Sequence, residues 1–142
     1  MTEHVLSRNP ATGEILARYP LQSPAELEQA LTKSASAFAL WQRSSLDDRV
    51  RVLRQLGEQI RLRENDLSRT ITLEMGKPIA QARAEVLKCA NLCDWYAEHG
   101  PAMLADQPTQ VADAWQRFRP LGVILAVMPW NFPLWQVLRD RK

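Results

Sequence analysis

The feature that most constrains the fold is an apolar run near the carboxyl end, residues 121–128, which reads LGVILAVM. The run does not alternate between polar and apolar residues, as a strand with one solvated face would. Apolar side chains on both faces are typical of a strand in a parallel sheet, where helices cover both sides. A buried helix is the alternative, but the run is short and Pro129 ends it. The sequence therefore predicts a buried strand over residues 121–128.

The place of this run in the chain conflicts with such a sheet. Fourteen residues follow Met128 in the 142-residue sequence. A parallel partner strand needs a crossover connection of roughly 10–12 residues before that strand can begin. Because the chain has no room for the partner, we expect it to be truncated inside a domain.

Composition excludes several classes of protein. Hydrophobic residues make up 46% of the chain, which is too many for intrinsic disorder. The apolar runs fall short of the ~18 residues that a membrane span needs. The net charge of +2 is too small to indicate nucleic acid or an anionic membrane as a partner. No signal peptide is recognisable and two cysteines are too few for a disulfide framework, so we expect a cytoplasmic protein.

The first half of the chain predicts a β-hairpin followed by helices. Residues 5–6 and 15–19 suit two strands, and the turn formers of residues 9–13 lie between them. Ser23 and Glu26 then have the spacing of a helix-capping box. A second helix is expected to start near Ser45.

Two further helices are expected before residue 105. Asn65 can cap a helix that ends at Gly76, and the next helix runs from about residue 79 towards residue 104. Residues 100–101, Gly-Pro, are expected to end or kink it. Gly57, on the inner face of the preceding helix, indicates a close contact between helices.

The segment PWNFP, residues 129–133, carries the chemistry that the sequence makes most visible. It directly follows the predicted strand, and ligands of open α/β sheets bind outside the carboxyl ends of strands. Two prolines restrict the backbone on either side of Asn131. The uncharged amide of Asn131 offers two N–H donors, which suit an oxyanion that forms only in a transition state. The alternative is an asparagine that hydrogen-bonds within its own turn.

Several short motifs together resemble the N-terminal part of the aldehyde dehydrogenase superfamily. The similarity extends over nearly the whole chain, and residues 133–137 are most similar to the succinate-semialdehyde branch. The motifs are NPATGE at residues 9–14, Trp41, EMGKP at 74–78, RPLGV at 119–123 and PWNFP at 129–133.

The resemblance implies a chemistry and a set of site residues. In this family a cysteine thiolate attacks an aldehyde, hydride passes to NAD or NADP, and a glutamate-activated water hydrolyses the resulting thioester. The resemblance assigns the oxyanion donor to Asn131. It assigns the lining of the cofactor pocket to residues 127–130, namely Val127, Met128, Pro129 and Trp130.

The resemblance also implies an organisation of the chain. Residues 1–105 correspond to the N-terminal hairpin and the helical part of the cofactor-binding domain. Residues 106–120 correspond to a hairpin through which family members join oligomer partners. Residues 121–142 correspond to the first strand and the start of the next helix of an incomplete Rossmann-like sheet. The nucleophilic cysteine, the catalytic glutamate, the cofactor-binding lysine and the glycine-rich turn lie later in a family chain.

Other candidate sites have simpler interpretations. Cys89 and Cys93 lie four residues apart among apolar neighbours, so we interpret them as core residues and not as nucleophiles. With the two histidines they do not form a zinc-binding pattern. The arginines of residues 43–69 alternate with acidic residues, which favours a solvated helix surface over a nucleic-acid site. Lys77 is interpreted as a cation at a helix C-terminus.

The sequence as a whole predicts an α/β fragment of an aldehyde dehydrogenase that oxidises a small aldehyde with NAD or NADP. The parent enzyme is expected to be a homo-oligomer, and the fragment alone is expected to be inactive. The alternative is a non-catalytic interaction or oligomerisation module derived from the same fold.

Overall fold

The computed structural model describes residues 3–139, which form two small hairpins and five helices. Strands β1 (His4–Arg8) and β2 (Ile15–Pro20) pair antiparallel, as predicted. The turn between them contains Gly13 at φ 76°, a left-handed conformation that glycine adopts without strain. The hairpin contacts helix α3 (Glu64–Met75), and Ser7 donates a hydrogen bond of 2.8 Å to Glu74 of that helix.

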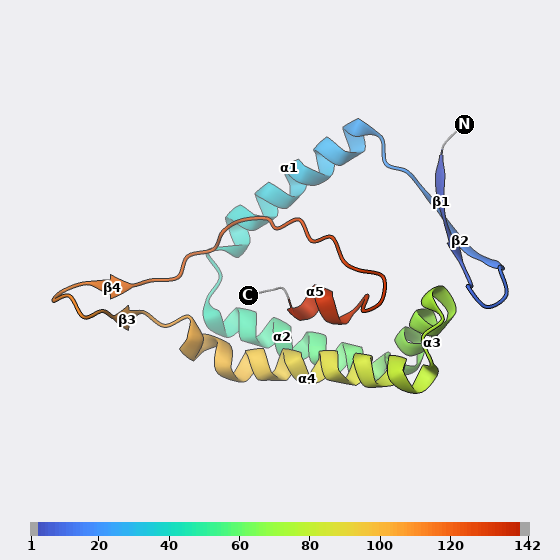
Figure 1. Ribbon diagram of the computed structural model, residues 1–142. Coiled ribbons are helices and arrows are strands. Elements are labelled where there is room, and N and C mark those ends of the chain that lie inside the picture. Colours follow the sequence, from blue (N-terminus) through green and yellow to red (C-terminus); the bar gives the residue numbers. More distant parts are fainter. Residues whose placement is uncertain (1–2, 140–142) are drawn as a thin grey trace.

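Helices α1 (Pro24–Trp41) and α2 (Leu46–Leu62) begin where the sequence predicts. Ser23 and Glu26 form the reciprocal hydrogen bonds of a capping box, and Ser45 caps α2 by accepting from the backbone N–H of Asp48. The two helices differ in packing. In the described structure no residue of α1 is buried, and Figure 1 shows this helix apart from the others.

The predicted cap of α3 is wrong. The residue before the helix is Arg63, which makes no side-chain cap, because α2 ends at Leu62 and leaves no loop in which Asn65 could act. Asn65 lies inside α3 and accepts a hydrogen bond from Arg83. The predicted end of the helix is confirmed: Gly76 adopts φ 75° in the C-cap position.

Helix α4 (Ile79–Met103) is the central element. It packs against α2, α3 and the short helix α5 (Trp135–Arg139). The helix continues through Gly100 and Pro101 for two more residues, because a proline in the last turn removes only one backbone hydrogen bond.

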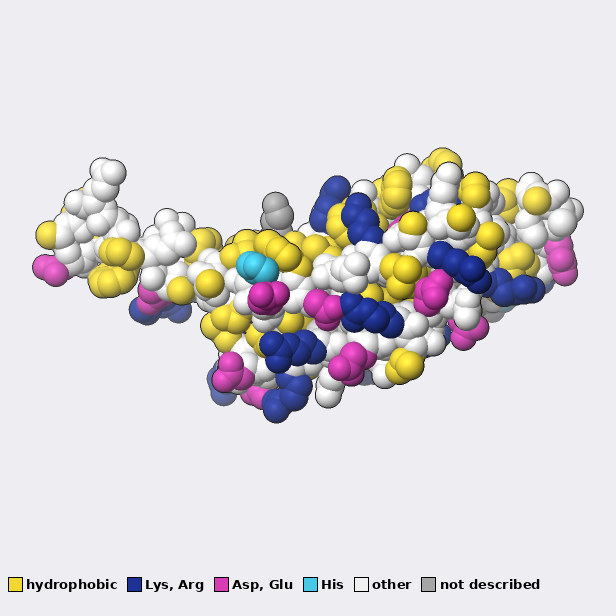
Figure 2. Space-filling view, turned by 90° about the horizontal axis from the view of Figure 1, so that it is seen from below, with side chains coloured by type: hydrophobic (Ala, Val, Ile, Leu, Met, Phe, Trp, Pro, Cys, Tyr) yellow, Lys and Arg dark blue, Asp and Glu magenta, His cyan; other side chains and the backbone are white. Residues whose placement is uncertain are grey.

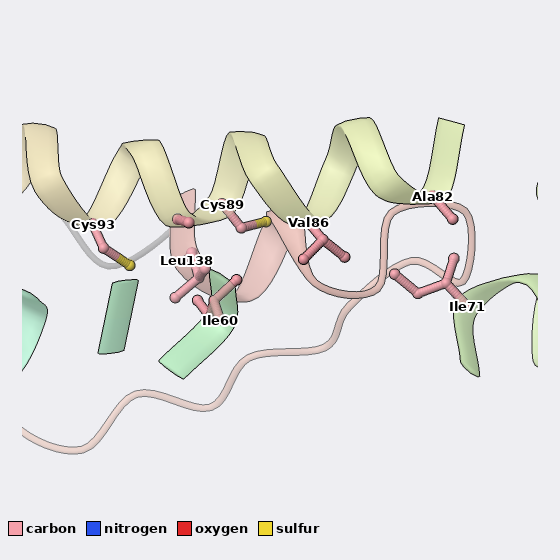
Figure 3. Packing of buried hydrophobic residues seen from close by; sticks show 8 residues of the cluster. Ile60, Ile71, Ala82, Val86, Cys89, Cys93 and Leu138 are labelled. Atoms are coloured by element: carbon pink, nitrogen blue, oxygen red, sulfur yellow. The ribbon is translucent and has the colours of Figure 1, made fainter. Parts of the chain in front are cut away.

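The core lies between α4 and its neighbours (Figure 3). Along α4 the buried side chains recur every three or four residues, which places them on one face. Most are small, so the partner helices approach closely. The core residues are Ile60, Ile71, Ala82, Val86, Cys89, Ala90, Cys93 and Leu138.

A second hairpin extends from the end of α4, away from the helices (Figure 1). Its two strands are β3 (Gln107–Pro108) and β4 (Trp115–Gln116), paired antiparallel. Arg117 forms an ion pair with Asp106 at the base of this hairpin, at 2.9 and 3.0 Å from its Nε atom to the two carboxylate oxygens.

The predicted strand over residues 121–128 is not formed within the described part of the chain. The segment is irregular, and most of its large side chains are exposed, Leu121 at 92% and Leu125 at 88%. The physical reason is that a strand requires hydrogen-bonding partners, and residues 3–139 provide none for this segment. Among the same residues no helix is both long and apolar enough to cross a membrane.

Candidate functional site

The candidate site is the loop of residues 129–134, which joins the exposed apolar segment to α5. Asn131 is exposed, and its backbone carbonyl accepts a hydrogen bond of 3.0 Å from the Nζ of Lys77, which lies between α3 and α4. The carbonyl of Phe132 accepts a hydrogen bond from the backbone N–H of Gln136, in the first turn of α5. The backbone of the loop is therefore fixed while the Asn131 side chain faces solvent.

A buried ion pair lies beneath this loop. Lys77, just after α3, and Glu85, on the buried face of α4, are 8% and 4% exposed and form a salt bridge. A carboxylate in such a place requires several donors to offset the loss of water. The second oxygen of Glu85 accepts from the backbone N–H groups of Leu134, at 3.2 Å, and Trp135, at 3.1 Å.

Two aromatic rings complete the contact between α4 and the loop. The Nζ of Lys77 lies 4.1 Å from the centroid of the Phe132 ring, and the Nζ of Lys88 lies 3.6 Å from the centroid of the Trp135 ring. Cation–π contacts of this kind hold a ring in place without a hydrogen bond. The loop is thus attached to α4 through charge, hydrogen bonds and ring contacts.

The residues assigned to the cofactor pocket form an open surface. Val127 is 84% exposed and Trp130 76%, Pro129 is exposed, and Met128 is half-buried. A cavity of about 340 Å³ lies between Trp130 and α3. These four residues therefore lie beside Asn131 and form one side of a pocket, and the described residues do not enclose it.

The two cysteines lie in the core, as interpreted from the sequence. Both are buried, 0% and 2% exposed, and Figure 3 shows them on the packed face of α4. Burial, and after it charge repulsion from the nearby Glu85 carboxylate, raise the pKa of Cys89 to about 12. A thiol with this pKa is protonated at neutral pH and is a poor nucleophile.

The sequence interpretation of Lys77 needs correction. Its ammonium group contacts Glu85, Asn131 and Phe132, so the side chain turns inward instead of neutralising a helix end. Glu85 was missed altogether. One signal could have found it: an acidic residue stands at a position of α4 where the apolar pattern places the core, beside Ala82 and Val86.

The arginines of residues 43–69 behave as a solvated surface. Arg51 pairs with Asp48, and Arg61 pairs with Asp94 on α4. Figure 2 shows basic and acidic side chains mixed across this face of the molecule. Across residues 3–139 no group of three or more His, Cys, Asp or Glu side chains could hold a metal ion.

The fold resembles the corresponding part of solved dehydrogenase structures. The structure of succinic semialdehyde dehydrogenase from Streptococcus pyogenes, in complex with NADP+, matches 94% of the chain with a TM-score of 0.88 and 28% identity. The succinate-semialdehyde dehydrogenase structure from Burkholderia pseudomallei matches 97% with a TM-score of 0.82 and 32% identity. The matches span 30% and 29% of those chains.

Sequence comparison gives the family. The profile of the aldehyde dehydrogenase family matches residues 1–141, and the chain belongs to this family. Succinate semialdehyde dehydrogenase [NAD(P)+] Sad of Escherichia coli is 54% identical over 138 residues, which are 96% of this chain. Succinate-semialdehyde dehydrogenase [NADP(+)] 1 of Mycobacterium tuberculosis is 41% identical over 136 residues. The chain spans about 30% of the length of each of these relatives.

Proposed function

We propose that these 142 residues are the N-terminal third of an NAD(P)-dependent dehydrogenase that oxidises a small aldehyde, succinate semialdehyde in the first place, to a carboxylic acid. The observation that carries the proposal is the loop with Asn131 exposed on a backbone fixed from below by Lys77 and Glu85. The identity of 54% to the E. coli enzyme supports the substrate. The names of the relatives support NAD or NADP as the cofactor.

In this proposal Asn131 and residues 127–130 have separate roles. The amide of Asn131 donates to the oxygen that becomes negatively charged when a cysteine from the remainder of the enzyme attacks the aldehyde. Residues 127–130 line one side of the cofactor site. The exposed side chains of Val127 and Trp130 are consistent with contact to a cofactor. The glycine-rich turn expected by resemblance belongs to the remainder of the enzyme. Bound NAD(P)+ supplies the hydride acceptor.

Two further features of the enzyme are proposed. The β3–β4 hairpin extends from the helices (Figure 1), which supports a role in joining subunits of a homo-oligomer. The composition supports a cytoplasmic enzyme, because two cysteines are too few for the disulfide framework of small secreted proteins.

The second candidate is a non-catalytic oligomerisation module that keeps the helices and the hairpin. The exposed hairpin is the observation that favours it. The coding sequence downstream of codon 142, translated in all three frames, distinguishes the two candidates. A cysteine nucleophile motif there supports the dehydrogenase, and its absence supports the module.

The activity test compares two proteins. The first is the 142-residue chain alone, which we expect to form no NADH or NADPH at 340 nm with succinate semialdehyde, because a thioester mechanism needs a nucleophile, a base and a hydride acceptor together. The second, called the hybrid enzyme, joins residues 1–139 to the sequence of the E. coli relative that lies beyond the match. We expect the hybrid enzyme to turn over, and a folded hybrid enzyme without turnover would overturn the proposal.

A further inference from the structure

We propose that Lys77 and Glu85 are positioning residues for the reaction: the buried pair sets the place of Asn131 by holding the loop backbone on both sides of Phe132. This inference rests on the proposed function, since it assigns the pair to the same site. Neither residue would touch the aldehyde or the cofactor. They act through Asn131.

Energetics indicate that the pair is not explained by stability alone. Both side chains are more than nine-tenths buried, and removing two charges from water is costly. Replacement of such a pair by apolar residues is often neutral or stabilising. A pair of this kind therefore needs another contribution, such as fixing one arrangement of the surrounding backbone.

The geometry shows which backbone is fixed. Beyond the salt bridge, both side chains form hydrogen bonds with the loop and with the first residue of α5. Lys77 donates to the carbonyl of Asn131, and Glu85 accepts from the N–H groups of Leu134 and Trp135. Because the two side chains also bind each other, a shift at either anchor is resisted by the other.

Catalysis is sensitive to the position of an oxyanion donor. A displacement of about 1 Å at a catalytic group can cost on the order of 100-fold in rate. Asn131 is exposed, so the described structure holds it through its backbone and not through packing of its side chain. Loss of the hydrogen bond from Lys77 would let the backbone carbonyl of residue 131 turn. The side-chain amide of Asn131 would move with it.

The main test is the double substitution Lys77→Met/Glu85→Gln in the hybrid enzyme. It leaves no buried charge unpaired, and the glutamine can still accept from the two loop amides. We expect a Tm within a few degrees of the unsubstituted hybrid enzyme, a kcat about 10- to 100-fold lower, and a smaller change in the KM for the aldehyde. A folded double variant with unchanged kcat would overturn the inference and leave the pair a purely structural feature.

Matched controls are Lys33→Met on α1 and Glu98→Gln on α4, which change the same residue types at exposed positions. Both should keep the kcat of the hybrid enzyme. Where the double variant does not unfold cooperatively, Glu85→Asp replaces it, because the shorter side chain keeps the charge beside Lys77 and withdraws the acceptor from the loop amides. The same loss of kcat is expected.

A double-mutant cycle separates positioning from an independent effect. If the pair acts through Asn131, Lys77→Met/Glu85→Gln should lower kcat about 10- to 100-fold in the unsubstituted enzyme and less than about 2-fold in an Asn131→Ala background. Losses that multiply would overturn the inference. An inactive, unsubstituted hybrid enzyme would instead overturn the proposed function, together with the inference that rests on it.

Discussion

Cys89 shows at the scale of one residue how burial decides the chemistry of a side chain. Its pKa is raised to about 12, whereas a thiol in an unfolded chain ionises near pH 8.5. Between these values the folded state binds one proton more than the unfolded state. The contribution of this thiol to the free energy of unfolding is therefore constant below about pH 8.5 and falls as the pH rises towards 12.

We expect iodoacetamide to modify Cys89 of the folded hybrid enzyme far more slowly than the same thiol in urea. Raising the pH from 8 to 10 should speed the reaction of the unfolded chain, since more thiolate forms, and leave the folded one slow. Mass spectrometry of the peptide that contains Cys89 measures both rates. Rapid labelling of the folded enzyme at pH 8 would contradict the buried position.

Trp130 should affect the cofactor and not the chemical step. Its ring is 76% exposed beside Asn131, on the surface assigned to the cofactor. Trp130→Ala in the hybrid enzyme is expected to weaken NADP+ binding about 10-fold or more, with a smaller effect on kcat, because a lost ring contact changes ground-state binding. Fluorescence titration with NADP+ measures the Kd. Trp95→Ala, at a half-exposed position of α4, is the control and should leave the Kd unchanged.

At the scale of elements, the crossing of α2 and α4 depends on the absence of a side chain at Gly57. A Cβ atom there would lie 3.2 Å from the carbonyl oxygen of Ala90 and 3.3 Å from the Cβ of Cys93. Alanine gains about 1 kcal/mol in helix propensity, but overpacking costs about 1–3 kcal/mol, and a helix backbone cannot easily move. We expect Gly57→Ala to lower the Tm of the hybrid enzyme.

Gly100→Ala is the matched control for this prediction. Gly100 also lies inside a helix, α4, and no atom would come within 4 Å of its Cβ. The gain in helix propensity is then unopposed, so the Tm should stay the same or rise slightly. Differential scanning fluorimetry of the two variants gives the comparison. Equal shifts would contradict the close crossing of the helices.

Elements set by local signals could be predicted from the sequence. The first hairpin follows from its turn residues, and the starts of α1 and α2 follow from Ser23 and Ser45, because a cap needs only neighbours in the chain. The start of α3 could not be predicted, since α2 ends at Leu62 and α3 begins at Glu64 without a side-chain cap. The prediction of a strand over residues 121–128 was wrong for another reason, because a strand forms only when a neighbouring strand provides hydrogen bonds.

The candidate site divides in the same way. The loop of residues 129–133 is recognisable from its prolines and from Asn131. The support beneath it is not, because Lys77 and Asn131 are 54 residues apart in the sequence and meet only after α4 has packed. The only local indication of such a long-range contact is a charged residue on an apolar helix face. Glu85 is that residue.

For the whole molecule, the exposed surface is larger than a compact protein would have. The accessible area is 11060 Å². A monomer of 16.2 kDa is expected to expose about 7,500 Å². The excess includes α1, with no buried residue in the described structure, and the apolar segment of residues 121–128.

We therefore expect the 142-residue chain expressed alone to aggregate or to remain loosely packed. Exposed apolar patches beyond a few hundred Å² are typical of interaction or aggregation surfaces. Sedimentation velocity and a thermal melt measure the two properties. A monomeric sample with one sharp cooperative transition would show that the chain buries this surface by itself.

In the proposed enzyme, a nucleophile reaches Asn131 only when the remainder of the molecule is present. The most direct measurement is steady-state kinetics of Asn131→Ala in the hybrid enzyme with succinate semialdehyde. Loss of one oxyanion donor should lower kcat and kcat/KM together by about 10²- to 10³-fold, with little change in the affinity for NADP+. Asn131→Asp should be at least as damaging, since it replaces a donor by a negative charge. An unchanged kcat with a raised KM for the cofactor alone would contradict the account.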